Sequence, residues 1–302
     1  PQGFVTFFFA SFASFLFLTS IMPVKFKDTA KAANDLLNND FLFNAQKIKI
    51  KSRTANGVSF TTEGTLKAGK GVSGKLTAGF SPFQGIDIGK LCVTTEGRFQ
   101  TEASLKDAIE GVKFTVKAEE GANKPPAGEL CVDYAANNTT VNASVDVCDV
   151  NGPTVYGASS YRYENFVVGG EVRYSTGFDS NESKPSVVDY NGTLSYLGPD
   201  FVATLQTKKK ASNAIISIHQ RTSKDLSIAT QYNHASKLLT VGGLYTLDAN
   251  TKFQGKLNSN GTVSANAIQT VSGGVKLISS VEVDSKNFSG DSHKFGLQLI
   301  LG

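Results

Sequence analysis

The side chains that could do chemistry are sparse in this chain of 302 residues, and they do not form a catalytic arrangement. The three histidines are His219, His234 and His293. They are isolated from one another, and none has an Asp, a Cys or a second His at metal-ligand spacing. Each histidine is therefore predicted to be a strand or turn residue. We expect no metal, no cofactor and no enzyme activity.

Two lysine-containing stretches come near to phosphate-binding loops. The stretch "GTLKAGKG" at 64–71 has two glycines and a lysine at P-loop spacing. However, Gly71 stands where a Ser or Thr would bind magnesium, and no helical pattern follows. For the run "KKK" at 208–210, a strand-end turn is favoured over a specific phosphate site. Both stretches are predicted to be turns between strands.

Charge and cysteine content exclude some classes of function. The formal net charge is +4, and the basic residues are spread along the chain. This excess is too thin for the concentrated basic face of a nucleic-acid-binding protein, but it suits a pore visited by small anions. The chain has three cysteines, an odd number without a C-x-x-C spacing, so free thiols are expected.

From Phe43 onward the sequence alternates between apolar and polar residues in segments of about 8–11 residues. Short turns rich in Gly, Asn, Asp, Lys or Ser separate segments such as "AQKIKIKS", "GVKFTVKAE" and "GVKLISSVEVD". No second helical pattern interrupts them, which excludes a parallel α/β sheet. The stretches "NKPPAG" at 123–128 and "DSNESKP" at 179–185 are interpreted as ordinary loops.

About nineteen strands can be counted, too many for one open twisted sheet without exposed edges. Closure into a barrel removes the edges, and a barrel of this size has an interior that must hold water. The polar faces are therefore predicted to line the lumen and the apolar faces to meet lipid. A soluble β-rich binding protein is the alternative, and it predicts extraction from membranes without detergent.

Lysines alternate with apolar residues in two of the predicted strands, opposite Ile48 and Ile50 in one and Val112, Phe114 and Val116 in the other. They would raise the local concentration of anions, with screening beyond about 10 Å at ordinary salt. The same lysines could instead merely keep the wall hydrated. The lysines predicted to line the lumen are Lys47, Lys49, Lys51, Lys113 and Lys117.

One amphipathic helix is predicted before the strands, over about 28–39 within the segment 22–42. Asp28 or Thr29 is the expected N-cap, and Ala30, Ala33, Leu36 and Leu37 recur at helical spacing. The helix is a candidate for a voltage-linked element because it carries charge, and the alternative is that it only stiffens the barrel. The candidate gating residues are Lys25, Lys27, Asp28, Lys31 and Asp35.

Residues 1–21 form the one continuous apolar run, long enough for a membrane helix or the core of a signal peptide. No Lys or Arg precedes the run, and the first methionine is Met22. We therefore interpret this run as a translated leader that is not part of the natural protein, with translation beginning at Met22. Residues 43–302 would then form the barrel.

The stretch "YTLDANTKFQGKLNSNGTVSANA" at 245–267 resembles the signature of the eukaryotic mitochondrial porins, the voltage-dependent anion channels. "EGVKF" at 110–114 and "SGDSHKFGLQL" at 289–299 are similar to two further motifs of that family, with Val112 in place of a leucine. Ala267 also departs from the pattern, which usually has a larger apolar residue. The matching signature positions include Tyr245, Asp248, Thr251, Lys256 and Asn258.

This resemblance implies a nineteen-stranded transmembrane barrel with the helix folded into the lumen and parallel pairing of the first and last strands. It implies a voltage-dependent, weakly anion-selective pore of the mitochondrial outer membrane that passes metabolites, nucleotides and small ions. Homo-oligomers are compatible with it. The last strand resembles the family's mitochondrial sorting signal at Lys294, Gly296, Leu299 and Leu301.

Two further points concern partners and alternatives. A gapless alignment back from Gly111 puts Lys90 where animal members carry a membrane-facing glutamate linked to hexokinase docking and calcium sensitivity. Hexokinase docking is therefore not carried over to this chain. The pore subunit of the mitochondrial outer-membrane protein translocase shares the barrel fold and is the alternative function. It would be expected to have a longer N-terminal extension and a more acidic lumen.

Overall fold

The protein is represented by a computed structural model that describes residues 23–121, 124–149, 152–177, 184–271, 273–288, 290 and 292–302. The predicted leader 1–21 and the predicted start at Met22 lie outside the described residues.

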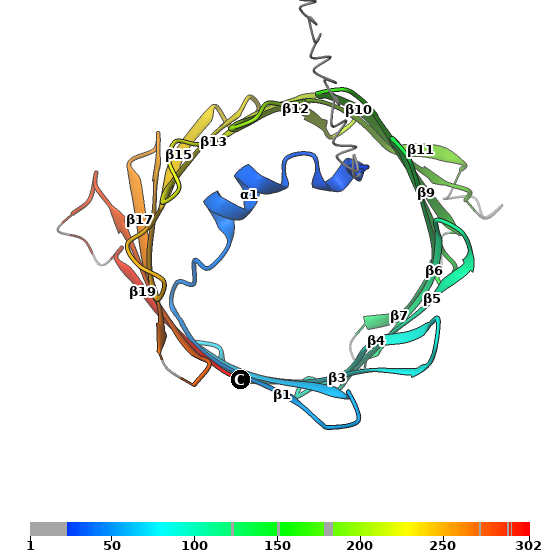
Figure 1. Cartoon of the computed structure of the whole chain (residues 1–302), viewed down its shortest axis with the longest axis horizontal. Helices are drawn as coiled ribbons and strands as arrows, with labels where there is room; N and C mark the ends of the chain where they lie inside the picture. Colours follow the sequence, from blue (N-terminus) through cyan, green and yellow to red (C-terminus); the bar gives the residue numbers. More distant parts are fainter. Residues whose placement is uncertain are drawn as a thin grey trace, which may run out of the picture.

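The described chain forms a closed barrel of nineteen strands around one short helix (Figure 1). Each strand pairs antiparallel with its neighbours in sequence, and β1 closes the ring by pairing parallel with β19, Ala45 opposite Gly296. Closure of an odd number of strands requires one such parallel seam. The predicted barrel, strand number and parallel seam are confirmed.

The first ten strands are β1 Ala45–Arg53, β2 Ser59–Lys67, β3 Gly71–Phe83, β4 Ile86–Thr94, β5 Arg98–Ile109, β6 Val112–Gly121, β7 Lys124–Ala136, β8 Thr139–Asp146, β9 Thr154–Tyr163 and β10 Phe166–Ser175. The remaining nine are β11 Ser186–Leu197, β12 Phe201–Lys208, β13 Asn213–Arg221, β14 Leu226–Asn233, β15 Leu238–Thr246, β16 Thr251–Asn258, β17 Thr262–Val271, β18 Val275–Asp284 and β19 Lys294–Leu301.

Alternation along the strands sends apolar side chains outward. Ile48 and Ile50 on β1 are 52% and 45% exposed on the outer surface, although they are large and apolar. An outer surface of this kind is stable only against hydrocarbon, because so large an exposed apolar area would be unfavourable in water. Several inward positions break the expected polarity. Ile268 on β17 and Ile278 on β18 stand opposite each other, face inward and are buried.

The N-terminal segment contains a 3-10 turn, Phe26–Asp28, followed by helix α1, Lys31–Asn38, inside the ring (Figure 1). The predicted apolar stripe is confirmed, since Ala30, Ala33, Leu36 and Leu37 are all buried. The predicted N-cap is wrong. Ala30 occupies that position without a side-chain hydrogen bond, and Thr29 uses its hydroxyl to bond the barrel wall instead.

The interpretation of 123–128 as a loop is also wrong for the described residues, 124–128. β7 begins at Lys124, and Pro125 and Pro126 lie within it at a register irregularity between Glu119 and Gly121 of β6. Proline lacks the N–H that a regular ladder needs, so it is tolerated at such an irregularity.

Among the described residues, α1 and the 3-10 turn are too short and too polar to count as a membrane-spanning helix.

Candidate functional site

The lumen is divided into two parts by the N-terminal segment, which follows one side of the ring (Figure 1). We call the inner faces of β8–β18, where this segment is bound, the helix-bound wall. The inner faces of β1–β7 and β19 form the open wall. The two walls differ in the kinds of side chain that they carry.

The first anchor of the segment joins Val24 and Thr29 to the helix-bound wall. The hydroxyl of Ser160 donates a hydrogen bond to the Val24 carbonyl, and Ser160 is itself bonded to Thr140 at 2.6 Å. The Nε2 of Gln206 donates to the Thr29 hydroxyl at 2.8 Å, and the Thr204 hydroxyl donates to the Thr29 carbonyl at 3.1 Å. These hydroxyls and amides supply polar partners that the non-helical backbone needs inside the barrel.

The second anchor is apolar and holds the middle of α1. Leu36 and Leu37 pack with Ala33 against Ala229 of β14 and Leu244 of β15. Burying a leucine side chain contributes about 1.5–3 kcal/mol, so these residues are a main source of helix binding. Gly242 permits the contact, because a Cβ there would lie 2.7 Å from Cδ2 of Leu37 and 2.9 Å from the Gly255 carbonyl oxygen.

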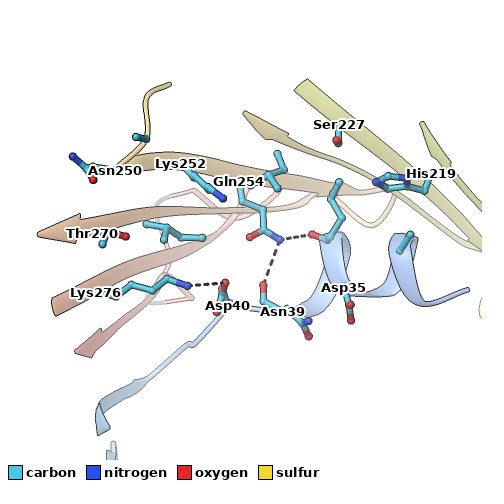
Figure 2. A pocket seen from close by; sticks show the side chains of 15 residues that line it. Asp35, Asn39, Asp40, His219, Ser227, Asn250, Lys252, Gln254, Thr270 and Lys276 are labelled. Atoms are coloured by element: carbon cyan, nitrogen blue, oxygen red, sulfur yellow. Dashed lines mark hydrogen bonds and ion pairs between the residues drawn. The ribbon is translucent and has the colours of Figure 1, made fainter. Parts of the chain in front are cut away.

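The third anchor caps the C-terminal end of α1 with side chains from β16. The Nζ of Lys256 donates to the Leu37 carbonyl at 2.8 Å and lies 4.4 Å from the Phe41 ring centroid. The Nε2 of Gln254 donates to the Leu36 carbonyl and to the Asn39 carbonyl (Figure 2). Helix ends leave carbonyls without partners, and a positive charge there also complements the helix dipole.

The segment leaves the lumen beside β18 and β19. The Ser280 hydroxyl donates to the Asp40 carbonyl at 3.3 Å and accepts from the Leu42 N–H at 3.3 Å. Gly296 of β19 lies directly against the Leu42 carbonyl, where any Cβ would collide with it. Gly296, predicted from the resemblance as part of a sorting signal, therefore also has a steric role in this fold.

A cavity of about 950 Å³ extends along the inner faces of β4–β7 of the open wall and continues over β8–β11 of the helix-bound wall. Among the described residues that line it, six are basic and six are acidic. The basic residues are Lys25, Lys27, Lys90, Lys113, Lys117 and Arg173. The acidic residues are Glu102, Glu119, Glu129, Asp133, Asp146 and Asp149. The lining of this cavity, which the open wall shares with β8–β11 and the start of the N-terminal segment, therefore presents both signs of charge to the lumen.

The predicted lumenal lysines lie on the inner face, and acids accompany them there. Lys47 and Lys49 share Glu63, at 3.2 Å and 2.7 Å, and Lys51 follows them on the same face of β1. Lys117 pairs with Glu129 at 2.8 Å.

Lys113 stands opposite Asp133 in the register of β6 and β7. The sequence prediction identified the lysines but not the carboxylates beside them. Cross-strand register, which the sequence pattern does not state, brings the two signs together.

Lys90 lies inside the barrel, whereas the family position that the gapless alignment matches to it faces the membrane. Lys90 stands opposite Glu102 of β5 and lines the lumenal cavity. The register of β4 and β5 shifts between Ile88 and Lys90, which leaves Gly89 as an extra residue. One inserted residue reverses which side chains face inward from that point.

The five candidate gating residues lie along the N-terminal segment, and their role in gating stays a prediction. Lys25 forms an ion pair with Asp133 of β7 at 3.0 Å, which links the segment to the open wall. Lys31 and Asp35 lie 3.9 Å apart on one face of α1. Lys27 is exposed to the cavity, and Asp28 is half-buried.

The signature residues are spread over several surfaces of β15 and β16 rather than forming one site. Tyr245 is on the outer surface, Lys256 caps α1, and Asn258 accepts a hydrogen bond from the Thr240 hydroxyl at 2.8 Å. Asp248 lies in the turn before Thr251, where the backbone N–H groups of Asn250 and Thr251 donate to its carboxylate. These donors hold the pKa of Asp248 below its ordinary value.

The residues of the predicted sorting signal also separate in the fold. Lys294 pairs with Glu282 at 2.7 Å on the inner face, whereas Leu299 and Leu301 follow the opposite face of β19. Their role in sorting stays a prediction.

Sequence reasoning did not single out the wall residues that bind the N-terminal segment. Thr204, Gln206, Gln254 and Ser280 contact residues that precede them by more than 170 positions in the chain. The only local signal was an uncharged polar side chain at an inward position. Ile278 gave a clearer sequence signal, since an apolar residue at an inward position of a water-filled barrel needs an apolar partner there.

Comparison with known proteins gives a consistent result over nearly the whole chain. The family model described as eukaryotic porin matches residues 22–296. The voltage-dependent anion-selective channel of Drosophila melanogaster is 30% identical over 294 residues, covering 92% of this chain and 99% of the relative.

Two vertebrate relatives agree with this match. The non-selective voltage-gated ion channel VDAC2 of Xenopus laevis is 29% identical, covering 93% of this chain and 99% of the relative. The non-selective voltage-gated ion channel VDAC3 of Homo sapiens is 28% identical, covering 89% of this chain and 95% of the relative.

Proposed function

The chain belongs to the eukaryotic porin family, and from this premise we propose that it is a voltage-dependent, weakly anion-selective diffusion pore for metabolites, nucleotides and small ions. The family and the closed barrel point to a channel rather than an enzyme. The observation that carries the proposal is the open wall, which faces a cavity of about 950 Å³ beside the bound helix.

Weak selectivity is supported by the charges around the large cavity. Acidic and basic side chains are equal in number among the described residues around the large cavity, so neither sign of ion meets a strong local field there. Lys47, Lys49 and Lys51 on β1 and Lys252 on β16 add positive charge elsewhere on the lumenal surface, against Glu63. A small positive excess favours anions modestly and leaves cations able to pass.

Voltage dependence is assigned to the charged N-terminal segment. Moving one elementary charge through the membrane field changes the free energy by about 2.3 kcal/mol per 100 mV. A small shift of Lys27 or Lys31 is therefore sufficient to make the segment respond to voltage. The segment is bonded at both ends, through Thr29 and through Leu37. We therefore assign the response to movement of the bonded segment and its wall together.

The mitochondrial outer membrane is the proposed location, on the basis of the family and of the residues that resemble its sorting signal. The apolar outer surface fits direct contact with a lipid bilayer. Assembly into homo-oligomers is compatible with this placement. Neither nucleic-acid binding nor hexokinase docking is part of the proposal. The described residues around the large cavity carry acidic and basic groups in equal number rather than the more acidic lumen expected of the translocase, and the family match favours the channel.

Reconstitution into planar bilayers in a potassium chloride gradient tests this proposal. We expect a reversal potential of the sign given by anion selectivity and of small size, with conductance that falls at high voltage of either sign. A strongly cation-selective, voltage-independent conductance would contradict the proposal and favour the translocase. Folded protein without any conductance would contradict both pore functions.

A further inference from the structure

A second, smaller cavity of about 490 Å³ lies between the C-terminal half of α1 and the inner faces of β13–β18 (Figure 2). Two lysines, Lys252 of β16 and Lys276 of β18, border it from strands on either side of β17. Thr270 of β17 stands opposite Lys276 in the register and also lines the cavity. Two ammonium groups and a hydroxyl therefore surround one end of this space.

The two lysines differ in their partners. Lys276 forms an ion pair with the Asp40 carboxylate at 3.6 Å, with both side chains about one-third exposed (Figure 2). Lys252 has no hydrogen bond or ion pair with any residue that the structure describes. The cavity thus contains one cation that an internal carboxylate neutralises and a second cation that is left for a soluble anion.

Asp40 is held at this cavity by its backbone as well as by Lys276. Its φ of 64° lies in the left-handed region, which an Asp adopts more readily than most residues. The Ser280 hydroxyl donates to its carbonyl, so the backbone position does not depend on the carboxylate. The side chain can therefore leave Lys276 without release of the segment.

We propose that the space between Lys252 and Lys276 binds a soluble phosphate-class oxyanion in competition with the Asp40 carboxylate. A phosphate group has several acceptor oxygens and can engage both ammonium groups and the Thr270 hydroxyl. Asp40 offers a single carboxylate to the same lysine. The site goes beyond the proposed conduction, because it links anion binding to a residue of the N-terminal segment.

Binding can be measured without any conductance, by titrating inorganic phosphate into the full protein in detergent micelles at constant ionic strength. The methyl group of Ile268, which lines the cavity, is the reporter in a methyl-labelled sample. Ile216, which is 47% exposed on the outer surface of β13, is the internal control. We expect a saturable chemical-shift change at Ile268 and none at Ile216. Equal or non-saturating changes at both would overturn the proposal.

Three variants test the assignment of the ligands. Lys252→Gln is expected to weaken phosphate binding about tenfold, the loss typical of one charged hydrogen bond. Asp40→Asn is expected to tighten it about two- to fivefold by removing the competitor, as for a partly exposed ion pair. Lys224→Gln changes the net charge equally in an exposed turn at the same end of the barrel, and should leave the affinity unchanged.

The proposal fails if Lys224→Gln weakens binding as much as Lys252→Gln, because the effect would then be general electrostatics. It also fails if Asp40→Asn leaves the affinity unchanged. Selectivity measured in bilayers is a separate quantity, so a wrong selectivity assignment and a wrong binding site give different results.

Discussion

On the helix-bound wall the inward positions that contact or adjoin the N-terminal segment carry mainly amides, hydroxyls, small residues and a few apolar side chains, whereas many inward positions of the open wall carry lysines and carboxylates. Gln206, Gln254, Leu244 and Ile278 are examples of the first kind. The ion pairs of Glu63 with Lys47 and Lys49 represent the second. Inward positions covered by the segment meet protein and those of the open wall meet water, although both lie on the inner face of one barrel.

Strand pairing differs in the same way. The register is irregular between β3 and β4, β4 and β5, β5 and β6, and β6 and β7, all in the open wall. Among the described pairs of the helix-bound wall, only β10 and β11 show an irregularity. Regular pairing keeps the inward side chains in fixed rows, which a bound helix requires. Irregular pairing increases local twist and bending, which a wall facing water tolerates.

The inner face of this barrel is therefore not one environment. Alternation determines whether a side chain faces inward, but its partner there determines which residue type is stable. The two walls can therefore be perturbed separately, and their responses should differ.

Deletion of residues 23–40 should have the largest effect, because it removes the partner of the whole helix-bound wall. We expect voltage-dependent closure to be lost and the barrel to be destabilised, since Ala229 and Leu244 would then face water. Planar-bilayer currents and thermal unfolding in detergent measure the two effects. Unchanged voltage-dependent closure would rule out the gating role of the segment.

The substitution Gly242→Val should have the next largest effect. A Cβ at this position meets Leu37 and the Gly255 carbonyl, so overpacking should cost about 1–3 kcal/mol and displace α1. We expect altered gating and faster proteolysis near Lys31, measured by bilayer recording and limited digestion. The adjacent Gly243→Val is the matched control, because its Cβ would lie 3.6 Å from the nearest atom, the Ser227 carbonyl oxygen. Equal effects of both variants would contradict the proposed contact.

A smaller effect is expected on the open wall from Lys49→Gln. Glu63 keeps Lys47 as a partner at 3.2 Å, so the barrel should remain folded and gating unchanged. The loss of one positive charge from the lumen should reduce the preference for chloride over potassium, measured as a smaller reversal potential. Lys237→Gln, in an exposed turn, carries the same net change and should alter the reversal potential less.

The smallest effect concerns the turn before β16, on the helix-bound side. The pKa of Asp248 is lower in the folded protein than its ordinary value of 3.8. The ionised carboxylate therefore stabilises the fold at pH values above 3.8, and this contribution is lost as the pH falls through the lower pKa of the folded protein. The wild type should therefore unfold at a slightly higher temperature than Asp248→Asn at pH 7, and the two should converge in acid. A difference that persists below pH 3 would contradict this assignment.

Much of the fold could be predicted because period-two alternation is a local property of the chain. The alternation of Val275 to Asp284 identified an outward and an inward face, and the count of such segments gave the number of strands. The apolar stripe of the N-terminal helix was visible for the same reason. These patterns follow from the geometry of a strand and a helix, which neighbouring residues determine.

The barrel, the family and the amphipathic helix could thus be predicted from local sequence patterns. Three placements became visible only in the folded barrel: Lys90 faces the lumen, Gly296 makes room for Leu42, and Gln254 caps α1. A single extra residue reverses the face of every residue after it, and contacts between segments more than 200 positions apart leave no local pattern. These placements depend on strand register and on closure of the ring, which exist only once the strands have assembled.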